Sequence, residues 1–268
     1  AMLQAINDPD LGITNVGGVP AMWGAMSLMP DIDSVDFSRI RVAATGAESV
    51  PEPMLKEWQQ RGILLQEVYG MTETSGVICM AQKSDLPQHM GYAGRALPYG
   101  DVKVMKSDTE EAAAGEVGEI WMRGAAVTPG YWNRPDATEE AFVGDWLKSG
   151  DIGRRDDTGR LSVEDRIKDM YISGGENVYP AEVESVLMAH PDIREVAVIG
   201  VADKKWGEVG CAVIASISGN PLSLEAVQAQ CDGHLARFKW PRRVEHTDAL
   251  PRNSTGKVQK FVLRQHYA

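Results

Sequence analysis

An alternation of strand and helix in the first third of the chain constrains its fold more than any other feature. Residues 39–44 and 63–68 are short apolar runs, and residues 51–61 between them carry the proline and the acidic first turn of a helix start. Strand, helix and strand in this order predict a right-handed parallel crossover. Because ligands in such sheets bind beyond the carboxyl ends of the strands, residues 46–48 and 69–74 are expected at one ligand-binding edge.

The sequence pattern changes after this segment. Residues 91–164 are short strands separated by glycine and proline turns, which favour a small β-barrel or a distorted antiparallel sheet. A charged bridge, residues 165–169, leads into a last unit with two helices and apolar strands. The predicted fold class is therefore α/β and α+β: the end of a large α/β N-terminal domain, a small β-barrel subdomain, a hinge, and a compact α+β C-terminal domain. The predicted bounds of the three parts are 1–90, 91–167 and 168–268.

Charge and cysteine content exclude several classes of protein. The chain has 268 residues, with 27 Lys and Arg against 38 Asp and Glu, and its net charge of −11 argues against a nucleic-acid partner. No apolar run approaches the roughly 18 residues that a membrane span needs. Three cysteines without a CxxC pair favour buried, reduced thiols in a cytoplasmic protein. They are Cys79, Cys211 and Cys231.

Two carboxylates occupy positions suited to ligand binding. Glu73 lies between two threonines after Gly70, and a carboxylate beside hydroxyls at a strand end suits Mg²⁺ that is shared with phosphate oxygens. A helix N-terminal cap accounts for the same residues. Asp151, which follows Ser149 and Gly150, can accept two ribose hydroxyls, or it can be an ordinary β-turn aspartate. Both alternatives stay open on the residues alone.

Three further segments place charge or glycine at turns. Arg166 and Lys168 are two residues apart in an extended bridge, so they point the same way, and Arg166 can pair with ribose or phosphate oxygens. The glycine-rich turn 173–177 can let a narrow ligand approach the backbone, or it can merely reverse the chain. Lys257 follows a Ser-Thr-Gly turn, which suits a mobile cation delivered to phosphate with little local backbone to hold it, but an ordinary surface turn fits equally. Neither the phosphate-loop motif nor the dinucleotide motif is present.

Five segments together resemble those of the acyl-adenylate-forming enzymes, which include acyl-CoA synthetases, luciferase-type enzymes and peptide-synthetase adenylation domains. They follow the order and spacing of that superfamily, and the similarity covers essentially the whole chain. The segments are Tyr69-Gly70-Met71-Thr72-Glu73-Thr74, Ser149-Gly150-Asp151, Asp165-Arg166-Ile167-Lys168-Asp169, Ser173-Gly174-Gly175-Glu176-Asn177 and Pro251 to Lys257. Residues 171–184 and 130–135 look most like the fatty-acyl-CoA ligase branch.

The resemblance implies a two-step ligase. A carboxylate attacks the α-phosphate of Mg·ATP to give acyl-AMP and pyrophosphate, and the thiol of coenzyme A then displaces AMP. Cations must stabilise the charge that builds on the phosphate in the first step. By similarity, Lys257 touches the carboxylate and the α-phosphate, Glu73 holds Mg²⁺, and Thr72 binds phosphate.

The remaining site residues are also implied by the resemblance. Asp151 and Arg166 are expected to bind the ribose hydroxyls, and Lys168 matches the hinge about which the C-terminal domain swings between the two steps. The other expected nucleotide-binding residues are Gly46, Ala47, Glu48, Tyr69 and Gly70. Those expected near coenzyme A are Gly174, Gly175, Trp206, Phe238 and Lys239. Those expected to line an apolar acyl pocket are Met22, Trp23, Met71 and Val77.

The resemblance leaves the substrate and the state of the chain open. A fatty or other apolar acid is expected. The alternatives are an amino-acid or aryl-acid adenylation domain, a luciferase-type oxidative enzyme, and a non-catalytic nucleotide-binding module. The chain opens inside a helical pattern at Ala1-Met2-Leu3, without a signal peptide, and residues 1–45 lack the family's Ser/Thr/Gly-rich phosphate loop. We therefore expect that an N-terminal part is missing, that the fragment alone is inactive, and that open strand edges favour a homo-oligomer.

Overall fold

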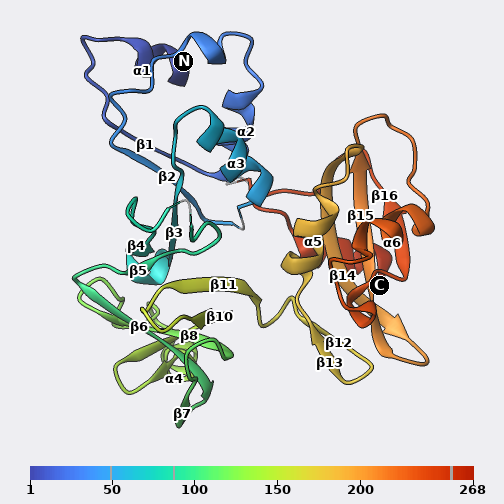
Figure 1. The fold of residues 1–268 in the computed structure, drawn as a ribbon. Helices are drawn as coiled ribbons and strands as arrows, with labels where there is room; N and C mark the ends of the chain where they lie inside the picture. Colours follow the sequence, from blue (N-terminus) through green and yellow to red (C-terminus); the bar gives the residue numbers. More distant parts are fainter. Residues whose placement is uncertain (49, 87, 254–255) are drawn as a thin grey trace. The chain divides into compact units, whose positions relative to one another are not determined.

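The computed structural model describes residues 1–48, 50–86, 88–253 and 256–268. It divides into two compact units, an N-terminal unit of residues Ala1–Val163 and a C-terminal unit of residues Glu164–Ala268. Figure 1 shows the elements of both, coloured along the sequence. Among the described residues, the N-terminal unit holds two sheets and the C-terminal unit one, and each unit has its own apolar packing.

The first sheet of the N-terminal unit holds five strands in the order β1-β2-β3-β4-β5. The first three strands are parallel, whereas β4 and β5 are antiparallel to their neighbours. Helix α3 connects β2 to β3, so the predicted parallel crossover is confirmed. The strands are β1 (Asn15–Gly18), β2 (Val42–Gly46), β3 (Gln66–Met71), β4 (Gly76–Met80) and β5 (Arg95–Ala96). The helices are α1 (Met2–Asn7), α2 (Pro20–Ser27) and α3 (Glu52–Gln60), with 3₁₀ turns η1 (Ile32–Ser34) and η2 (Thr72–Thr74).

Two of these strands lie further along the chain than the sequence predicted. β2 ends at Gly46 rather than at residue 44, and β3 ends at Met71 rather than at residue 68. The apolar pattern misplaced both ends, because their last residues pair through backbone groups that polar and glycine side chains do not reveal. Tyr69 is therefore a strand residue and is buried.

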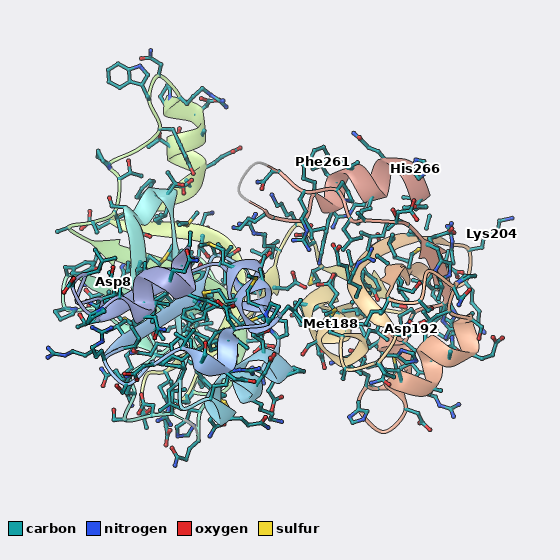
Figure 2. All side chains as sticks on the ribbon, turned by 90° about the horizontal axis from the view of Figure 1, so that it is seen from above. Asp8, Met188, Asp192, Lys204, Phe261 and His266 are labelled. Atoms are coloured by element: carbon teal, nitrogen blue, oxygen red, sulfur yellow. The ribbon has the colours of Figure 1, made fainter. Side chains whose placement is uncertain are left out.

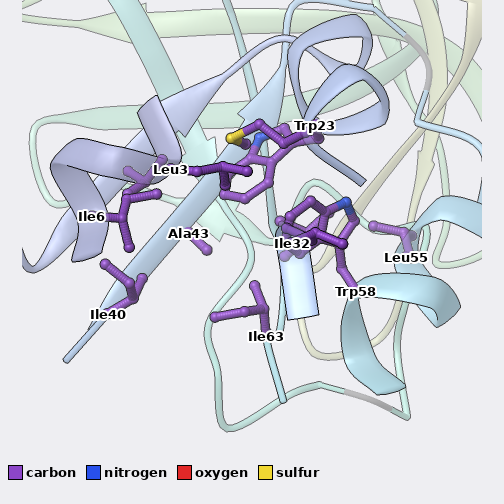
Figure 3. Packing of buried hydrophobic residues seen from close by; sticks show 12 residues of the cluster. Leu3, Ile6, Trp23, Ile32, Ile40, Ala43, Leu55, Trp58 and Ile63 are labelled. Atoms are coloured by element: carbon purple, nitrogen blue, oxygen red, sulfur yellow. The ribbon is translucent and has the colours of Figure 1, made fainter. Parts of the chain in front are cut away.

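Tryptophan rings dominate the apolar core of this part of the molecule (Figure 3). The ring of Trp23 lies edge-on to that of Trp58, with centroids 5.0 Å apart, and Phe37 meets Trp58 edge-on at 5.7 Å. Trp23 comes from α2 and Trp58 from α3. Because aromatic side chains bury large apolar areas, this pair fixes the two helices that lead into and out of the strand ends.

The second sheet of the N-terminal unit is open. Its strand order is β11-β10-β8-β6-β7, with β9 paired to β10, and no closed barrel forms among the described residues. The predicted small β-barrel is therefore wrong. Its two edges do not meet because β7 is a two-residue, exposed strand and because Leu161 of β11 bridges to Gly94. The elements are β6 (Gly100–Ser107), β7 (Glu110–Glu111), β8 (Val117–Gly124), α4 (Pro135–Ala141), β9 (Phe142–Val143), β10 (Trp146–Arg155) and β11 (Leu161–Arg166).

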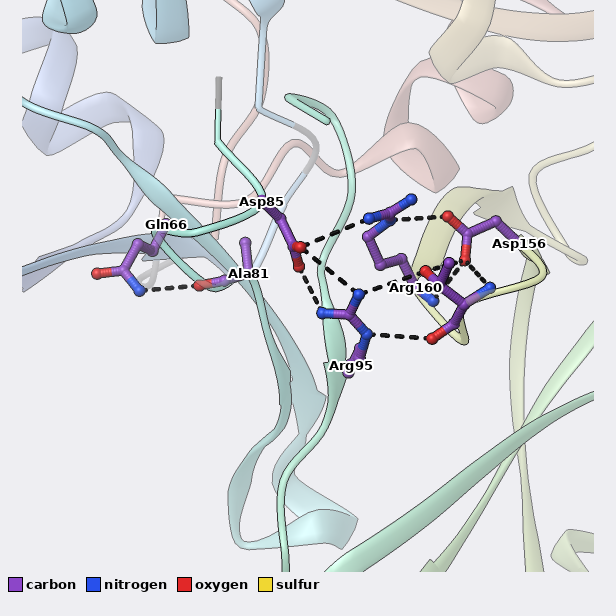
Figure 4. A network of polar contacts seen from close by, with 7 residues as sticks. Gln66, Ala81, Asp85, Arg95, Asp156 and Arg160 are labelled. Atoms are coloured by element: carbon purple, nitrogen blue, oxygen red, sulfur yellow. Dashed lines mark hydrogen bonds and ion pairs between the residues drawn. The ribbon is translucent and has the colours of Figure 1, made fainter. Parts of the chain in front are cut away.

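A network of charged side chains joins the two sheets of this unit (Figure 4). Asp85 accepts from Arg95 at 2.6 Å and lies 3.5 Å from Arg160, whose Nε contacts Asp156 at 2.7 Å. All four side chains are at least two-thirds buried, so solvent screens these pairs less than pairs on an open surface. The network fixes the connection between residues 81–95 and the turn that precedes β11.

The C-terminal unit is built on one sheet of order β13-β12-β15-β14, with β16 paired to β15. One apolar cluster lies against α5 and α6, and a second contains Leu263 of α7, so helices cover both faces of the β14–β15 pair. Figure 2 shows Phe261 and His266 on α7. The elements are β12 (Tyr171–Ser173), β13 (Glu176–Val178), α5 (Pro180–Leu187), β14 (Ile193–Asp203), β15 (Gly207–Ser216), α6 (Leu224–Cys231), η3 (Arg237–Lys239), β16 (Arg243–His246) and α7 (Lys260–Tyr267).

Two predictions from composition can be compared with the described ranges. All three cysteines are buried and carry free thiols, as expected. Burial raises the pKa of the Cys211 and Cys231 thiols to about 11, so both stay protonated at neutral pH. Within these ranges no helix has both the length and the apolar character that crossing a bilayer requires.

Candidate functional site

The carboxyl ends of β2 and β3 meet at one edge of the first sheet. Their parallel register pairs Gly46 with Val68, so the loop that follows Gly46 starts beside Tyr69. The two predicted nucleotide segments, residues 46–48 and 69–74, therefore lie at the same edge. This is the arrangement that the parallel crossover required.

Gly70 lets strand β4 approach β3 closely at this edge. A Cβ atom built on Gly70 would lie 1.8 Å from the carbonyl oxygen of Gly76, so only glycine fits at this close approach. The hydroxyl of Thr74, which is fully buried, accepts from the Met71 amide at 3.0 Å and donates to the Gly76 carbonyl at 2.7 Å. Thr74 thus closes the η2 turn from inside, and Thr72 is left exposed.

Glu73 is held by a loop far away in the sequence. Tyr131 Oη donates to Glu73 Oε1 at 2.8 Å across a separation of 58 residues. The Thr128 amide donates to the Glu73 carbonyl at 2.7 Å. The side chain that caps η2 is therefore Thr74, not Glu73, and the carboxylate of Glu73 is directed at Tyr131. Sequence reasoning missed this contact, because residues 130–135 supported only the family resemblance and no spacing signals a pair so distant.

Asp151 is hydrogen-bonded to Tyr69. Tyr69 Oη donates to Asp151 Oδ2 at 2.8 Å, and Asp151 is 8% exposed. Burial, followed by the charge of Asp151, raises the pKa of Tyr69 well above its usual value, so the phenol remains a donor. Asp151 belongs to β10, where the register shifts between Lys148 and Ile152, so the alternative of an ordinary β-turn does not describe it.

A second carboxylate fixes the segment that carries Asp151. Glu119 Oε1 accepts from the Gly150 amide at 3.0 Å, and its Oε2 accepts from Trp121 Nε1 at 3.0 Å. The Ser149 hydroxyl accepts from the Asp151 amide at 3.0 Å. Glu119 was not singled out from the sequence, where it is one acidic residue in an alternating strand. Its partners are set by the β8–β10 pairing.

The loops at this edge contain uncommon backbone conformations. Three non-glycine residues in the described ranges have positive φ, namely Ala47 at 74°, Ser75 at 54° and Asn133 at 52°. Ala47 follows β2, Ser75 follows η2, and Asn133 follows the tyrosine that holds Glu73. Such conformations cost free energy and gather at functional sites, which supports a functional role for these loops.

The predicted acyl-pocket residues do not form one group. Trp23 is 1% exposed, and its Nε1 donates to the Ala44 carbonyl at 3.1 Å inside the core. Met71 packs against the apolar cluster that contains Tyr69, and the Val77 carbonyl accepts from the Tyr99 hydroxyl. Met22 is 41% exposed and lines an apolar cavity of about 270 Å³ between α1 and α2, which the other three residues do not line.

Lys257 lies in the C-terminal unit on a hydrogen-bonded loop. Its amide donates to Asn253 Oδ1 at 2.9 Å, and its carbonyl accepts from the Asn253 amide at 2.9 Å. Arg252 ties the loop to β14 by a 3.0 Å pair with Glu195. Asn253 thus bonds the backbone of Lys257 through both its side chain and its amide. That Lys257 is a mobile cation stays a prediction. Ser254 and Thr255 of the predicted motif lie outside the described residues.

The linker around the predicted hinge also belongs to the C-terminal unit. Asp165 Oδ2 accepts from the Ala181 amide at 2.7 Å, at the start of α5. Asp169 Oδ1 pairs with Arg264 of α7 at 2.7 Å. Lys168 lies between these two anchored aspartates. Arg166, whose amide donates to Asp165 Oδ1 at 2.7 Å, lies in the same segment.

The residues expected near coenzyme A also lie in this unit. The Gly174 amide donates to the Trp206 carbonyl at 2.8 Å, so Trp206 lies beside the Gly174–Gly175 turn. Arg242 lies over the Trp206 ring at 5.0 Å. Lys239 pairs with Glu182 at 2.6 Å and lies 5.8 Å from the Phe238 ring.

The side chains at the sheet edge fit a magnesium ion that is shared with phosphates. Mg²⁺ commonly takes one or two carboxylates and completes its shell with water and phosphate oxygens. Glu73 supplies one carboxylate beside the exposed Thr72. Within the described part of the chain, no group of three or more His, Cys, Asp or Glu side chains could hold a metal ion. A magnesium site that is shared with phosphate oxygens does not require such a group of three side chains.

Two family models match this chain. Residues 3–132 match the AMP-binding enzyme family, and residues 182–257 match the AMP-binding enzyme C-terminal domain. The chain belongs to the family of AMP-binding enzymes. Its mixed α/β fold agrees with solved structures of adenylate-forming enzymes.

The chain is also similar to a curated relative and to solved structures. The long-chain-fatty-acid–CoA ligase FadD13 of Mycobacterium tuberculosis is 41% identical over 252 residues, which are 94% of this chain and 50% of the relative. ATP-bound MatB of Rhodopseudomonas palustris has a TM-score of 0.90 at 34% identity, covering 99% of this chain and 52% of that one.

The o-succinylbenzoate CoA synthetase MenE of Bacillus subtilis, in complex with its acyl-adenylate intermediate, has a TM-score of 0.86 at 35% identity. The match covers 98% of this chain and 52% of that one. The chain thus spans about half the length of FadD13 and of both solved structures.

Proposed function

We propose that this chain supplies the nucleotide edge and the mobile C-terminal domain of an AMP-forming acid–thiol ligase. The observation that carries the proposal is that Tyr69 lies near the end of a strand of the parallel β2–β3 pair, bonds to Asp151 and is followed closely by Glu73, in a chain of the AMP-binding family. The partners are a carboxylic acid, ATP with Mg²⁺, and coenzyme A.

In the first step, a carboxylate oxygen of the acid attacks the α-phosphorus of ATP, and the bond to pyrophosphate breaks. Asp151 and Arg166 bind the ribose hydroxyls, while residues 46–48, Tyr69 and Gly70 border the base. Thr72 would bind phosphate, and Glu73 would hold Mg²⁺. The metal would supply positive charge to the phosphate oxygens. The Lys257 ammonium neutralises the remaining charge where the two anions meet.

In the second step, the thiol of coenzyme A attacks the carbonyl carbon of acyl-AMP, and AMP leaves. The two steps need different groups beside the same carbonyl carbon. A swing of the C-terminal domain about Lys168 therefore removes Lys257 and brings the Gly174–Gly175 turn towards the acyl-adenylate. Trp206, Phe238 and Lys239 then lie near the nucleotide end of coenzyme A. Lys239 is already paired with Glu182, so it exchanges that partner on binding phosphate.

The acid is a fatty or other apolar carboxylic acid. Met22, Met71 and Val77 are apolar side chains on the elements around the sheet edge, and Trp23 supports them from the core. FadD13 carries a long-chain fatty-acid name, whereas MenE carries the name of an aryl acid. The apolar composition favours the first class, and an aryl-acid adenylating enzyme is the runner-up.

The test is made on the full-length polypeptide that contains residues 1–268. Exchange of labelled pyrophosphate into ATP should require an added acid, and a panel of short, medium, long-chain and aryl acids should rank the substrates. Thioester formation with coenzyme A should follow. Tight AMP binding without exchange for any acid would replace this proposal with a non-catalytic nucleotide-binding module.

A further inference from the structure

We propose that Tyr131 is a positioning residue for the metal carboxylate: it engages one oxygen of Glu73 and thereby presents the other to the metal and the phosphates. The inference rests on the proposed function. It assigns a role to the 130–135 loop, which the proposed mechanism does not use.

The contact between the two side chains is direct. Tyr131 Oη donates to Glu73 Oε1 at 2.8 Å. A glutamate side chain on a surface turn otherwise samples several rotamers, each pointing its carboxylate in a different direction. A single donor on Oε1 selects one of these directions and leaves Oε2 for the metal. Because the bond already orders the Glu73 side chain, metal binding loses less conformational entropy.

The backbones of the two loops are joined as well. The Thr128 amide donates to the Glu73 carbonyl at 2.7 Å, and the Ser75 hydroxyl donates to the Ala126 carbonyl at 2.8 Å. One of these bonds is made by the backbone of Glu73 itself, and the other by Ser75 two residues further on. The η2 turn and the 126–131 loop therefore form one assembly within the N-terminal unit.

Tyr131 is itself held in place. Its amide donates to Thr138 Oγ1 at 2.9 Å, and the Thr138 hydroxyl donates to the Arg134 carbonyl at 2.8 Å at the start of α4. A Cβ atom on Gly130 would lie 2.7 Å from the Thr138 methyl group, so glycine is needed for this approach. The order of positioning thus runs from α4 to Tyr131 and from Tyr131 to Glu73.

The adjacent aromatic residue provides a matched control. Trp132 is 91% exposed, whereas Tyr131 is 39% exposed and donates its hydroxyl hydrogen to Glu73. Tyr131→Phe removes only the hydroxyl. Trp132→Phe changes a ring of the same loop and leaves the bond to Glu73 in place.

The experiment measures Mn²⁺ binding to the full-length polypeptide with ATP, by electron spin resonance of the free ion. Hydrogen bonds to charged groups are worth enough that Tyr131→Phe should weaken Mn²⁺ binding about tenfold. Trp132→Phe should bind Mn²⁺ as the wild type does. The Mg²⁺ concentration for half-maximal pyrophosphate exchange should rise in parallel, while thioester formation from supplied acyl-AMP stays unchanged.

A double-mutant cycle separates positioning from general damage. In a Glu73→Gln background, adding Tyr131→Phe should change Mn²⁺ binding by less than about twofold, because the two residues act as one unit. Wild-type Mn²⁺ affinity in Tyr131→Phe would overturn the positioning role while leaving the proposed function intact. An equally large loss in the Glu73→Gln background would overturn it too. Absence of nucleotide-dependent metal binding in the wild type would overturn both proposals.

Discussion

The phenol of Tyr69 and the carboxylate of Asp151 form a buried hydrogen bond of 2.8 Å between residues 82 positions apart. The bond joins β3 of the first sheet to β10 of the second, open sheet. The two residues that we propose to bind the base and the ribose of one nucleotide are therefore in direct contact.

Removing the Tyr69 hydroxyl should cost both stability and nucleotide affinity. Tyr69→Phe takes a donor away from a buried carboxylate, which costs about 1–3 kcal/mol of unfolding free energy. Denaturant unfolding and calorimetric titration with AMP would measure the two effects. Tyr99→Phe is the control, since the Tyr99 hydroxyl donates to the Val77 carbonyl at 2.8 Å from an exposed position. Equal losses of unfolding free energy and AMP affinity in the two variants would show that the buried bond to Asp151 contributes no more than an exposed one.

Glu67 should make the stability of the N-terminal unit fall between pH 4.5 and about 7. Burial raises the pKa of Glu67 to about 7, and a hydrogen bond from the Gly91 amide opposes the shift in part. The folded state therefore keeps a proton that the unfolded state has lost, so the stabilisation present below pH 4.5 disappears as the pH rises to about 7.

A neutral side chain at this position should remove that dependence. At pH 8, Glu67→Gln should be more stable than wild type by about 2–3 kcal/mol, with little difference at pH 4.5. Urea unfolding at several pH values would measure it. Glu139→Gln, at an exposed position, is the control. Parallel pH curves for wild type and Glu67→Gln would contradict the shifted pKa.

A single methyl group at Gly70 should disrupt the strand end. Because the added Cβ would lie 1.8 Å from the Gly76 carbonyl oxygen, backbone must move, and Gly70→Ala should lose about 3 kcal/mol or more. Gly17→Ala in β1 is the matched control, since a Cβ there meets nothing within 4 Å. Thermal unfolding of both variants decides the matter. A Gly70→Ala protein as stable as Gly17→Ala would mean that β3 and β4 do not approach as closely at Gly70 as described.

Loss of the Lys257 ammonium should separate the two half-reactions. In the full-length polypeptide, Lys257→Ala should slow adenylation by about 10²–10³-fold, because one cation facing the developing charge is removed. Thioester formation from supplied acyl-AMP should persist. Lys204→Ala, at an exposed position of the same unit, should leave both rates unchanged. Equal losses in both half-reactions would show that Lys257 does not serve adenylation alone.

The sequence predicted the features that local patterns encode. The β2–α3–β3 crossover and the buried cysteines follow from apolar periodicity, cap chemistry and cysteine spacing, and the structure confirms them. The motif positions of Glu73 and Asp151 could also be read from the chain. Their roles as ligands remain predictions.

The sequence could not predict features that depend on pairing between distant segments. Tyr131 and Glu119 are ordinary residues of a loop and a strand until tertiary packing brings them to Glu73 and Gly150. The open sheet was mistaken for a barrel because closure depends on whether β7 and β11 meet, and short alternating strands carry no signal for this.

The anchoring of the linker has a consequence for any swing of the C-terminal unit. Asp165 is bonded to the start of α5 and Asp169 to Arg264 of α7, so turning the backbone at residue 168 strains or breaks one of these two bonds. Helix α7 also begins three residues after Lys257. One short helix therefore holds Asp169, next to Lys168, and begins just after Lys257, so both segments are anchored to the same element of the C-terminal unit.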